Sequence, residues 1–454
     1  MTPAAPGNPL TGVRPLSSRA RTAVLVAAFA GLLFDGVEMG LMPIASLSVS
    51  KSLIGAAYTP TLGGDWFARF TAALMLGAAV GGISLGALGD HIGRARAMGV
   101  SILLYSNFAG AGAFVETQEQ MLALRFFVGL GAGGMWPNGV ALVSECWPNA
   151  SRPLVAGVTG AGINAGYLLL SVIASQWHVT PDSWRWLFQW AILPALLGLV
   201  SLRWLPESPK WLASRAAVPS SGSATPVAPP PLNSFRKLFR PPLLRVSLAG
   251  IALGSVPLVG AWAGSKWMVP RADQVGGTSE PGYKALTTLW WAIGATAGSF
   301  CGAPFTSLVG RRLAYFLFSM GAVILTFSLF TFTAPLQPAF LPMVCAQGFT
   351  ATLFFGWLPL CLPELFPTRV RATGAGMAYN SGRFATAIGV FLAGTLFTAL
   401  GGSYARVGAA TSFIYALGLI VIWLVPGAGK DLAGRSLGPD GIGPRAGRAG
   451  LESD

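Results

Sequence analysis

Long apolar stretches, separated by short polar segments, make up most of the chain. Twelve of them reach roughly 20 residues, the length that a helix needs to cross a bilayer. They lie near residues 23–47, 64–89, 96–115, 121–145, 153–176, 184–205, 243–268, 285–308, 312–333, 337–363, 372–399 and 405–425. The pattern predicts an all-α membrane protein with twelve transmembrane helices.

The composition supports a membrane protein. Hydrophobic residues make up 53% of the chain and charged residues only 10%, whereas soluble domains carry about 25% charged residues. A net charge of +14 would suit a nucleic-acid partner, but the basic residues lie in short loops and form no continuous patch. We therefore expect a lipid bilayer around the protein and no nucleic-acid partner.

Lysine and arginine are concentrated in every second loop. One side of the membrane receives the basic N-terminal tail, the central loop, the C-terminal tail and the loops with Arg94, Arg152, Arg311 and Arg371. The opposite loops hold few basic residues, such as Lys51 and Lys284. The positive-inside rule predicts that both termini are cytoplasmic, in a plasma (inner) membrane protein.

The central loop divides the predicted helices six and six. The expected parts are a cytoplasmic N-terminal tail (1–22), a six-helix bundle (23–205), the central loop (206–241), a second bundle (242–426) and a disordered C-terminal tail (427–454). Within the loop, residues 216–231 are rich in proline, serine and alanine, which predicts a flexible linker.

The two bundles share an internal repeat. Glu145, followed by proline three residues later and by Arg152, comes after the fourth apolar stretch, and the same spacing joins Glu364 to Arg371 after the tenth. Gly-Arg pairs at 93–94 and 310–311 recur at nearly the same offset. A duplicated six-helix unit explains both, and a site at the interface of two such repeats is a known transporter arrangement.

Two carboxylates lie inside the first apolar stretch. Asp35 and Glu38 are three residues apart, so a helix carries them on one face. A charge at bilayer depth costs at least about 2.5 kcal/mol, so both must face a bundle interior or an aqueous cavity. They are therefore the candidates for proton coupling, and the alternative is a structural ion pair with a buried arginine.

Several segments resemble the signature motifs of the major facilitator superfamily. The loop from Gly86 to Arg96 is similar to its first signature, with Asp90, Gly93, Arg94 and Arg96 in the expected places, although Ser307 replaces the aspartate in the second half. Arg125 to Gly134, Pro206 to Leu212, and Pro363 to Gly374 resemble further segments of the superfamily. The resemblance implies two six-helix bundles and alternating access. It also implies that the loop with Asp90, Gly93, Arg94 and Arg96 acts as a gating latch. Glu145 and Glu364 lie near the cytoplasmic ends, where Arg94, Arg152, Arg311 and Arg371 can pair with them, so we assign these residues to gating as well.

Two further features bear on the branch of the superfamily. Phe34 to Glu38 resembles the Asp-Gly-x-Asp motif of aromatic-acid:proton symporters, with Glu38 in the second acidic place. Arg383 resembles the lone arginine that organic-ion and metabolite symporters carry in the eleventh helix. The seventh stretch lacks the Gln-Gln pair of sugar porters, which argues against sugar transport.

Deep cations and aromatic residues supply the candidates for substrate binding. An anionic substrate would meet Arg125, Arg383 or Lys266, and aromatic rings would line its body. The ring candidates are Trp262, Trp267, Trp290, Trp291 and Trp357, together with Trp136. The alternatives are that Arg125 orders helices, that Lys266 snorkels to the interface, and that most of the tryptophans belong to the interfacial belt.

Together these features predict a transporter and no enzyme. The four cysteines and two histidines show no metal-binding or catalytic spacing, so we expect no metal and no cofactor. The function expected is proton-coupled symport of a small organic acid by a monomer. The alternatives are a proton-coupled exporter of a metabolite or drug, a sugar porter, and a non-transporting membrane sensor.

Overall fold

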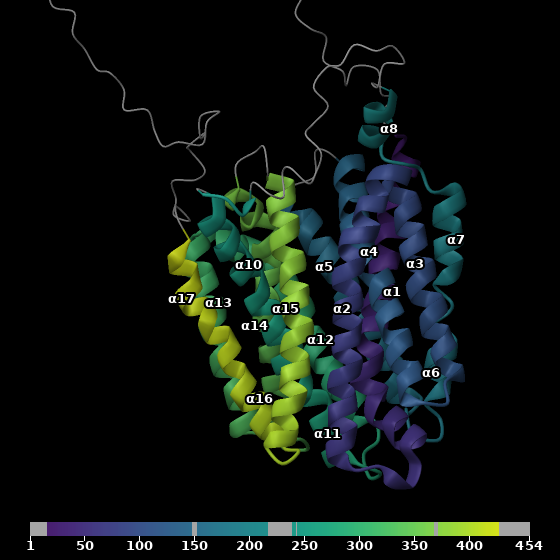
Figure 1. The fold of residues 1–454 in the computed structure, drawn as a ribbon, viewed down its shortest axis with the longest axis vertical. Coiled ribbons are helices and arrows are strands. Elements are labelled where there is room, and N and C mark those ends of the chain that lie inside the picture. The colour runs from purple at the N-terminus through teal and green to yellow at the C-terminus, as the bar shows by residue number, and fades with distance from the viewer. Residues whose placement is uncertain (1–15, 148–151, 217–237, 242, 367–370, 426–454) are drawn as a thin grey trace, which may run out of the picture.

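The computed structural model describes residues 16–147, 152–216, 238–241, 243–366 and 371–425, without the side chains of 152–160, 214–216 and 371–373. Figure 1 shows a bundle of long, roughly parallel helices. The first group is α1 (Ser18–Ile54), α2 (Pro60–Ile92), α3 (Arg94–Ala111), α4 (Gln118–Cys146), α5 (Arg152–Gln176), α6 (Arg185–Trp190) and α7 (Ala195–Trp204). After α8 (Pro209–Ala216) come α10 (Leu243–Val259), α11 (Met268–Gly276), α12 (Tyr283–Val309), α13 (Arg311–Thr331), α14 (Phe340–Cys361), α15 (Arg371–Ala399), α16 (Tyr404–Ser412) and α17 (Ala416–Leu424). We call α1–α7 the N-terminal half and α10–α17 the C-terminal half.

The twelve predicted membrane crossings correspond to twelve helical segments of this structure. In the part of the chain that the structure describes, eleven of these segments are long and apolar enough to cross a bilayer. The twelfth is α5, whose apolar part, Ala161–Gln176, is shorter. Three crossings are interrupted helices: α6 with α7, α16 with α17, and α10 with α11. Between α10 and α11 the chain makes a π-helical turn, Gly260–Gly264. The tails 1–15 and 426–454 and the linker 217–237 lie outside the described residues.

Local sequence fixes where several helices begin and end. The Thr117 hydroxyl accepts a hydrogen bond from the Gln120 backbone N–H, and the Gln120 side chain bonds back, which forms a capping box for α4. Gly93 and Gly310, the glycines of the predicted repeat, have φ of +105° and +91° and form the tight turns from α2 to α3 and from α12 to α13. Glycine is suited to both positions because side chains disfavour positive φ.

Glycine also brings helices into close contact within each half. Gly77 and Gly81 of α2 pack directly on the backbone of α4, and Gly294, Gly298 and Gly302 of α12 pack on the backbone of α14. A Cβ atom at any of these positions would overlap the facing helix. The repeat therefore recurs in the packing: the second helix of each half touches the fourth through small residues.

The halves contact each other mainly through α2 with α15 and α5 with α12. In Figure 1 one end of the bundle carries α8 and the opposite end carries α11, and we name the two ends after these helices. Near the α11 end, the Trp267 ring packs on Phe67 of α2, and Phe397 of α15 packs against Gly64. Midway along, the Asn164 amide donates to Ser299 Oγ at 2.9 Å.

At the α8 end, the ion pairs of Arg94 and Arg311 each join elements of one half. Arg94 pairs with Asp90 and Glu145, and Glu207 accepts hydrogen bonds from the first N–H groups of α3. Arg311 pairs with Glu364 within the C-terminal half. The halves are thus bonded to each other at the middle and at the α11 end.

Candidate functional site

The two predicted carboxylates lie at the middle of α1, inside the protein. Asp35 and Glu38 are each 1% exposed. Between them, Gly36 lies so close to the Ile163 backbone of α5 that a side chain there would overlap it. None of the four carboxylate oxygens accepts a hydrogen bond from a described residue. The placement agrees with the expectation that these acids cannot face lipid.

Arg125 and Arg383 bring positive charge to the two acids. Arg125 of α4 is 1% exposed, and its Nη2 lies 3.8 Å from Glu38 Oε2. Arg383 of α15 lies near enough to Asp35 for their charges to attract each other. Its Nη1 donates to the Ala78 carbonyl at 2.9 Å, so this arginine reaches from the C-terminal half into the N-terminal half. Glu38 is thus paired within its own half, whereas Asp35 forms no salt bridge with a described residue and is attracted at longer range by Arg383 of the opposite half.

Lys266 lies in a cage of aromatic rings. It follows the π-helical turn, is 3% exposed, and forms no hydrogen bond or ion pair with another described residue. Its Nζ lies 3.5 Å from the ring centre of Trp291, 4.2 Å from that of Tyr167 and 5.6 Å from that of Trp262. Tyr167 belongs to α5, so both halves contribute to the cage.

The other tryptophans occupy different surroundings. Trp267 is 1% exposed among Phe67, Phe397 and Tyr404 near the α11 end. Trp357 is buried within the C-terminal half, where its indole N–H donates to the Arg311 carbonyl. Trp290 is only partly buried, at the edge of the core. These three therefore do not share the space around Lys266.

Trp136 reaches the boundary between the halves. Its ring stacks on Tyr379 of α15, with centroids 4.9 Å apart. The guanidinium group of Arg383 lies over the same Tyr379 ring, with its Cζ 5.3 Å from the ring centroid. The stack therefore places two aromatic rings beside the arginine that faces Asp35.

The predicted gating residues meet in the same way in both halves. Arg94 Nε lies 3.8 Å from Glu145 Oε1, and the repeat equivalents Arg311 and Glu364 lie 2.5 Å apart. Arg94 also pairs with Asp90 at 2.6 Å. Arg96 is exposed, and the side chains of Arg152 and Arg371 lie outside the described residues.

Sequence reasoning missed an ion pair near the α11 end. Lys284 Nζ lies 3.0 Å from Asp273 Oδ1 and donates to Ser48 Oγ of α1, also at 3.0 Å. Lys284 is 3% exposed, although its place in a loop of the sequence suggested a surface residue. The only signal available was an aspartate and a lysine flanking one short connection, which is too common a pattern to single out.

Sequence reasoning also missed the polar network behind the cage. Gln347 of α14 accepts a hydrogen bond from the Trp291 indole at 3.1 Å and donates to Ser265 and to Thr326. A lone glutamine within an apolar stretch was the available signal, because such a group must find partners inside the protein.

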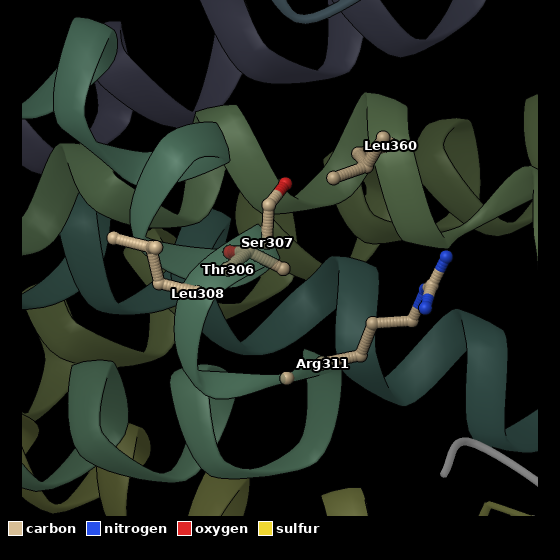
Figure 2. Close-up of a pocket in the computed structure, with 6 residues that line it drawn as sticks. Thr306, Ser307, Leu308, Arg311 and Leu360 are labelled. Atoms are coloured by element: carbon tan, nitrogen blue, oxygen red, sulfur yellow. The ribbon is translucent and has the colours of Figure 1, made fainter. Parts of the chain in front are cut away.

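A surface pocket of about 280 Å³ lies elsewhere, at the α8 end of α12 and α13. Figure 2 shows Arg311, Ser307 and Leu360 along it. Arg311 is already paired with Glu364, and the side chain of Leu308 is 85% exposed. The pocket is therefore a feature of the gating turn and lies apart from the buried charges.

Comparisons with known proteins agree with this architecture. Residues 24–265 match the model of the Major Facilitator Superfamily, and residues 272–430 match that of the sugar (and other) transporter family. The chain is 30% identical to the cis,cis-muconate transport protein of Acinetobacter baylyi, over 83% of this chain and 87% of that protein. It is 24% identical to the 4-hydroxybenzoate transporter of Pseudomonas putida, over 84% and 87% respectively.

A solved structure shows the same fold. The xylose transporter of E. coli, described as partially occluded and inward open, superposes with a TM-score of 0.67 at 17% identity, over 89% of this chain and 98% of that one. The twelve helical segments, the repeated gating pairs, the matched family models and the relatives lead to one conclusion: the chain belongs to the major facilitator superfamily and is a multi-pass membrane transport protein.

Proposed function

We propose that this protein is a secondary active transporter that carries a small organic acid together with a proton. One observation carries the proposal: Asp35 and Glu38 are buried at the middle of α1, accept no hydrogen bond from a described residue, and have Arg125 of the same half 3.8 Å from Glu38 and the longer-range charge of Arg383 from the other half. Relatives named for muconate and 4-hydroxybenzoate transport support the substrate class.

The buried acids can exchange protons when water reaches them. A carboxylate removed from water and left without hydrogen bonds is costly, and binding a proton removes that cost. Rehydration of the same group when the cavity opens lets the proton leave. Arg383 connects this step to the movement of the halves, because it faces Asp35 from the C-terminal half.

An anionic substrate suits the charge of the site. Arg383 and Lys266 bring basic groups to the boundary between the halves, where each contacts a residue of the N-terminal half. One proton and one carboxylate together add no net charge to the cavity, which lowers the cost of moving the loaded site through the bilayer. We therefore expect symport in which the proton and the acid cross together.

We further propose that the α8 end faces the cytoplasm, with both termini on that side, since the basic loops lie there. The pairs Arg94–Glu145 and Arg311–Glu364 then serve as cytoplasmic gate residues. All of the site residues belong to one chain, so a monomer in the bilayer is sufficient for transport.

Uptake into proteoliposomes tests the coupling. We expect 4-hydroxybenzoate or cis,cis-muconate to accumulate when the outside is more acidic, and accumulation to disappear when a protonophore collapses the gradient. Asp35→Asn or Glu38→Gln should abolish accumulation while retaining exchange of labelled for unlabelled substrate. The exposed Asp182→Asn is the matched control. Undiminished gradient-driven uptake in both variants would refute the proposal.

A further inference from the structure

We propose that Lys266 and Tyr167 bind the carboxylate of the transported acid, and that the rings of Trp262 and Trp291 hold a flat, unsaturated body attached to it. The inference rests on the proposed transport of an organic acid, and it assigns where the acid group binds and what shape of molecule fits.

Lys266 is a buried lysine that is paired with no carboxylate among the described residues. Its Nζ lies against the faces of Trp291 and Tyr167, at 3.5 and 4.2 Å from their centres, and it forms no ion pair with a described carboxylate. Ring faces attract a cation, yet they do not replace the strong, directed hydrogen bonds that an ammonium group forms with an anion. A buried ammonium in this state is suited to receive an anion.

Tyr167 supplies a second donor at the same place. Its hydroxyl is buried and has no hydrogen-bond partner among the described residues. Buried hydroxyl groups normally have one, so this donor is also available to a ligand. Tyr167 comes from α5 and Lys266 from the segment after α10, so an anion bound to both would connect the two halves.

The cage also adjoins the proposed proton site. Gly40 of α1 packs against the Tyr167 ring, and Gly40 lies only two residues beyond Glu38. Movement of α1 on protonation of its acids would therefore act on a ring that contacts Lys266. The Tyr167 side chain therefore contacts both Lys266, in the proposed carboxylate site, and α1, which carries the coupling acids.

Hydrogen bonds behind the cage hold it in shape before a ligand arrives. Gln347 fixes the plane of the Trp291 ring through the indole N–H and at the same time donates to Ser265, the residue before Lys266. Tyr415 lies 3.3 Å from the same Ser265 hydroxyl. The π-helical turn Gly260–Gly264 leads directly into this segment, and such turns often mark functional sites. A cage that is ordered before binding lowers the entropy cost of binding, and aromatic ring faces can stack on a flat, unsaturated ligand.

Binding to the purified protein tests the assignment. We would measure the Kd of 4-hydroxybenzoate, benzoate and cis,cis-muconate by calorimetry, with 4-hydroxybenzamide as the uncharged analogue. Lys266→Met should weaken binding of the acids by about 10- to 100-fold, or about 1.4–2.8 kcal/mol, and should leave the amide unchanged. Tyr167→Phe should weaken the acids less, and Lys266→Arg should restore much of the affinity. Lys210→Met, at an exposed lysine, is the matched control.

Two results would overturn the inference. The first is a Lys266→Met protein, folded by its melting curve, that binds the acids as tightly as the wild type. The second is a wild-type protein that binds none of the three acids. If only the proposed proton coupling is wrong, Lys266→Met should still weaken binding of the acids, whereas uptake by the wild-type protein should not respond to the pH gradient.

Discussion

The hydrogen bond from Lys284 to Ser48 connects the two halves near the α11 end, so removing it should favour opening at that end. Ser48→Ala deletes the acceptor on α1 and leaves the Lys284–Asp273 pair in place. Lys284→Met would be a poorer test, because it leaves the partly buried Asp273 carboxylate without its main partner, which is destabilising in itself.

The structure sets the size of the effect. A hydrogen bond to a charged group contributes about 1.5–3 kcal/mol, and each 1.4 kcal/mol is about tenfold in an equilibrium. If the bond exists only in the conformation seen here, its loss should shift the equilibrium toward the opposite conformation by about 10- to 150-fold. Ser48 also donates to the Val179 carbonyl at 3.1 Å. Both residues belong to the N-terminal half, so losing this second hydrogen bond should destabilise both conformations equally and leave the equilibrium between them unchanged.

Distance measurements between spin labels can detect the shift. Phe114 and Phe332 lie at the α11 end of different halves and are 79% and 73% exposed, so cysteines there can be labelled once the four native cysteines are replaced. We expect Ser48→Ala to raise the population with a longer distance. Ser144→Ala, which removes a bond inside α4, should have no effect. An unchanged distance distribution in Ser48→Ala would show that the bond does not hold the halves together.

Three further predictions follow from packing and charge. Gly36→Ala forces a Cβ into the backbone of α5 and should lower the melting temperature or prevent folding, whereas Gly376→Ala, with open space around it, should not destabilise the protein in the same thermal melt. Arg125→Met leaves Glu38 without its cation and should cost about 3–5 kcal/mol, much of which the added Glu38→Gln should restore in chemical unfolding. Glu364→Gln removes the charge of a partly exposed, bidentate ion pair within the C-terminal half, so stability in chemical unfolding should fall by about 1 kcal/mol.

Features that repeat along the chain could be predicted from the sequence. The apolar stretches predicted twelve crossings, and the structure has twelve corresponding segments. The duplicated Glu145 and Glu364 suggested partners among nearby arginines, and the structure places Arg94 and Arg311 beside them. Burial of Asp35 followed from the cost of a charge in lipid. Each of these inferences depends on local spacing or on one strong energetic penalty.

Contacts between distant segments could not be predicted in this way. The cage around Lys266 combines α5, α12 and the turn after α10, and no spacing in the sequence connects them. Lys266 lies near the end of its apolar stretch and directly after the π-helical turn Gly260–Gly264, so the sequence left open whether it binds substrate or snorkels to the interface. Trp357 was named as a substrate-binding candidate, but it is buried within the C-terminal half and bonds to the Arg311 carbonyl. Hydrophobicity alone cannot distinguish a ring that lines a binding site from a ring buried in the packing of one half.

The distribution of polar contacts between the two ends suggests how the halves move. At the α8 end, the pairs of Arg94 and Arg311 lie within their own halves and can persist while the halves separate or approach. Near the α11 end, Lys284 bonds across the boundary and must release Ser48 when that end opens. Arg383 and Lys266, at the middle, contact groups of both halves and would feel either movement. Among the described residues, rocking of the two halves would therefore strain the bonds of Lys284, Arg383 and Asn164, which join the halves near the α11 end and at the middle.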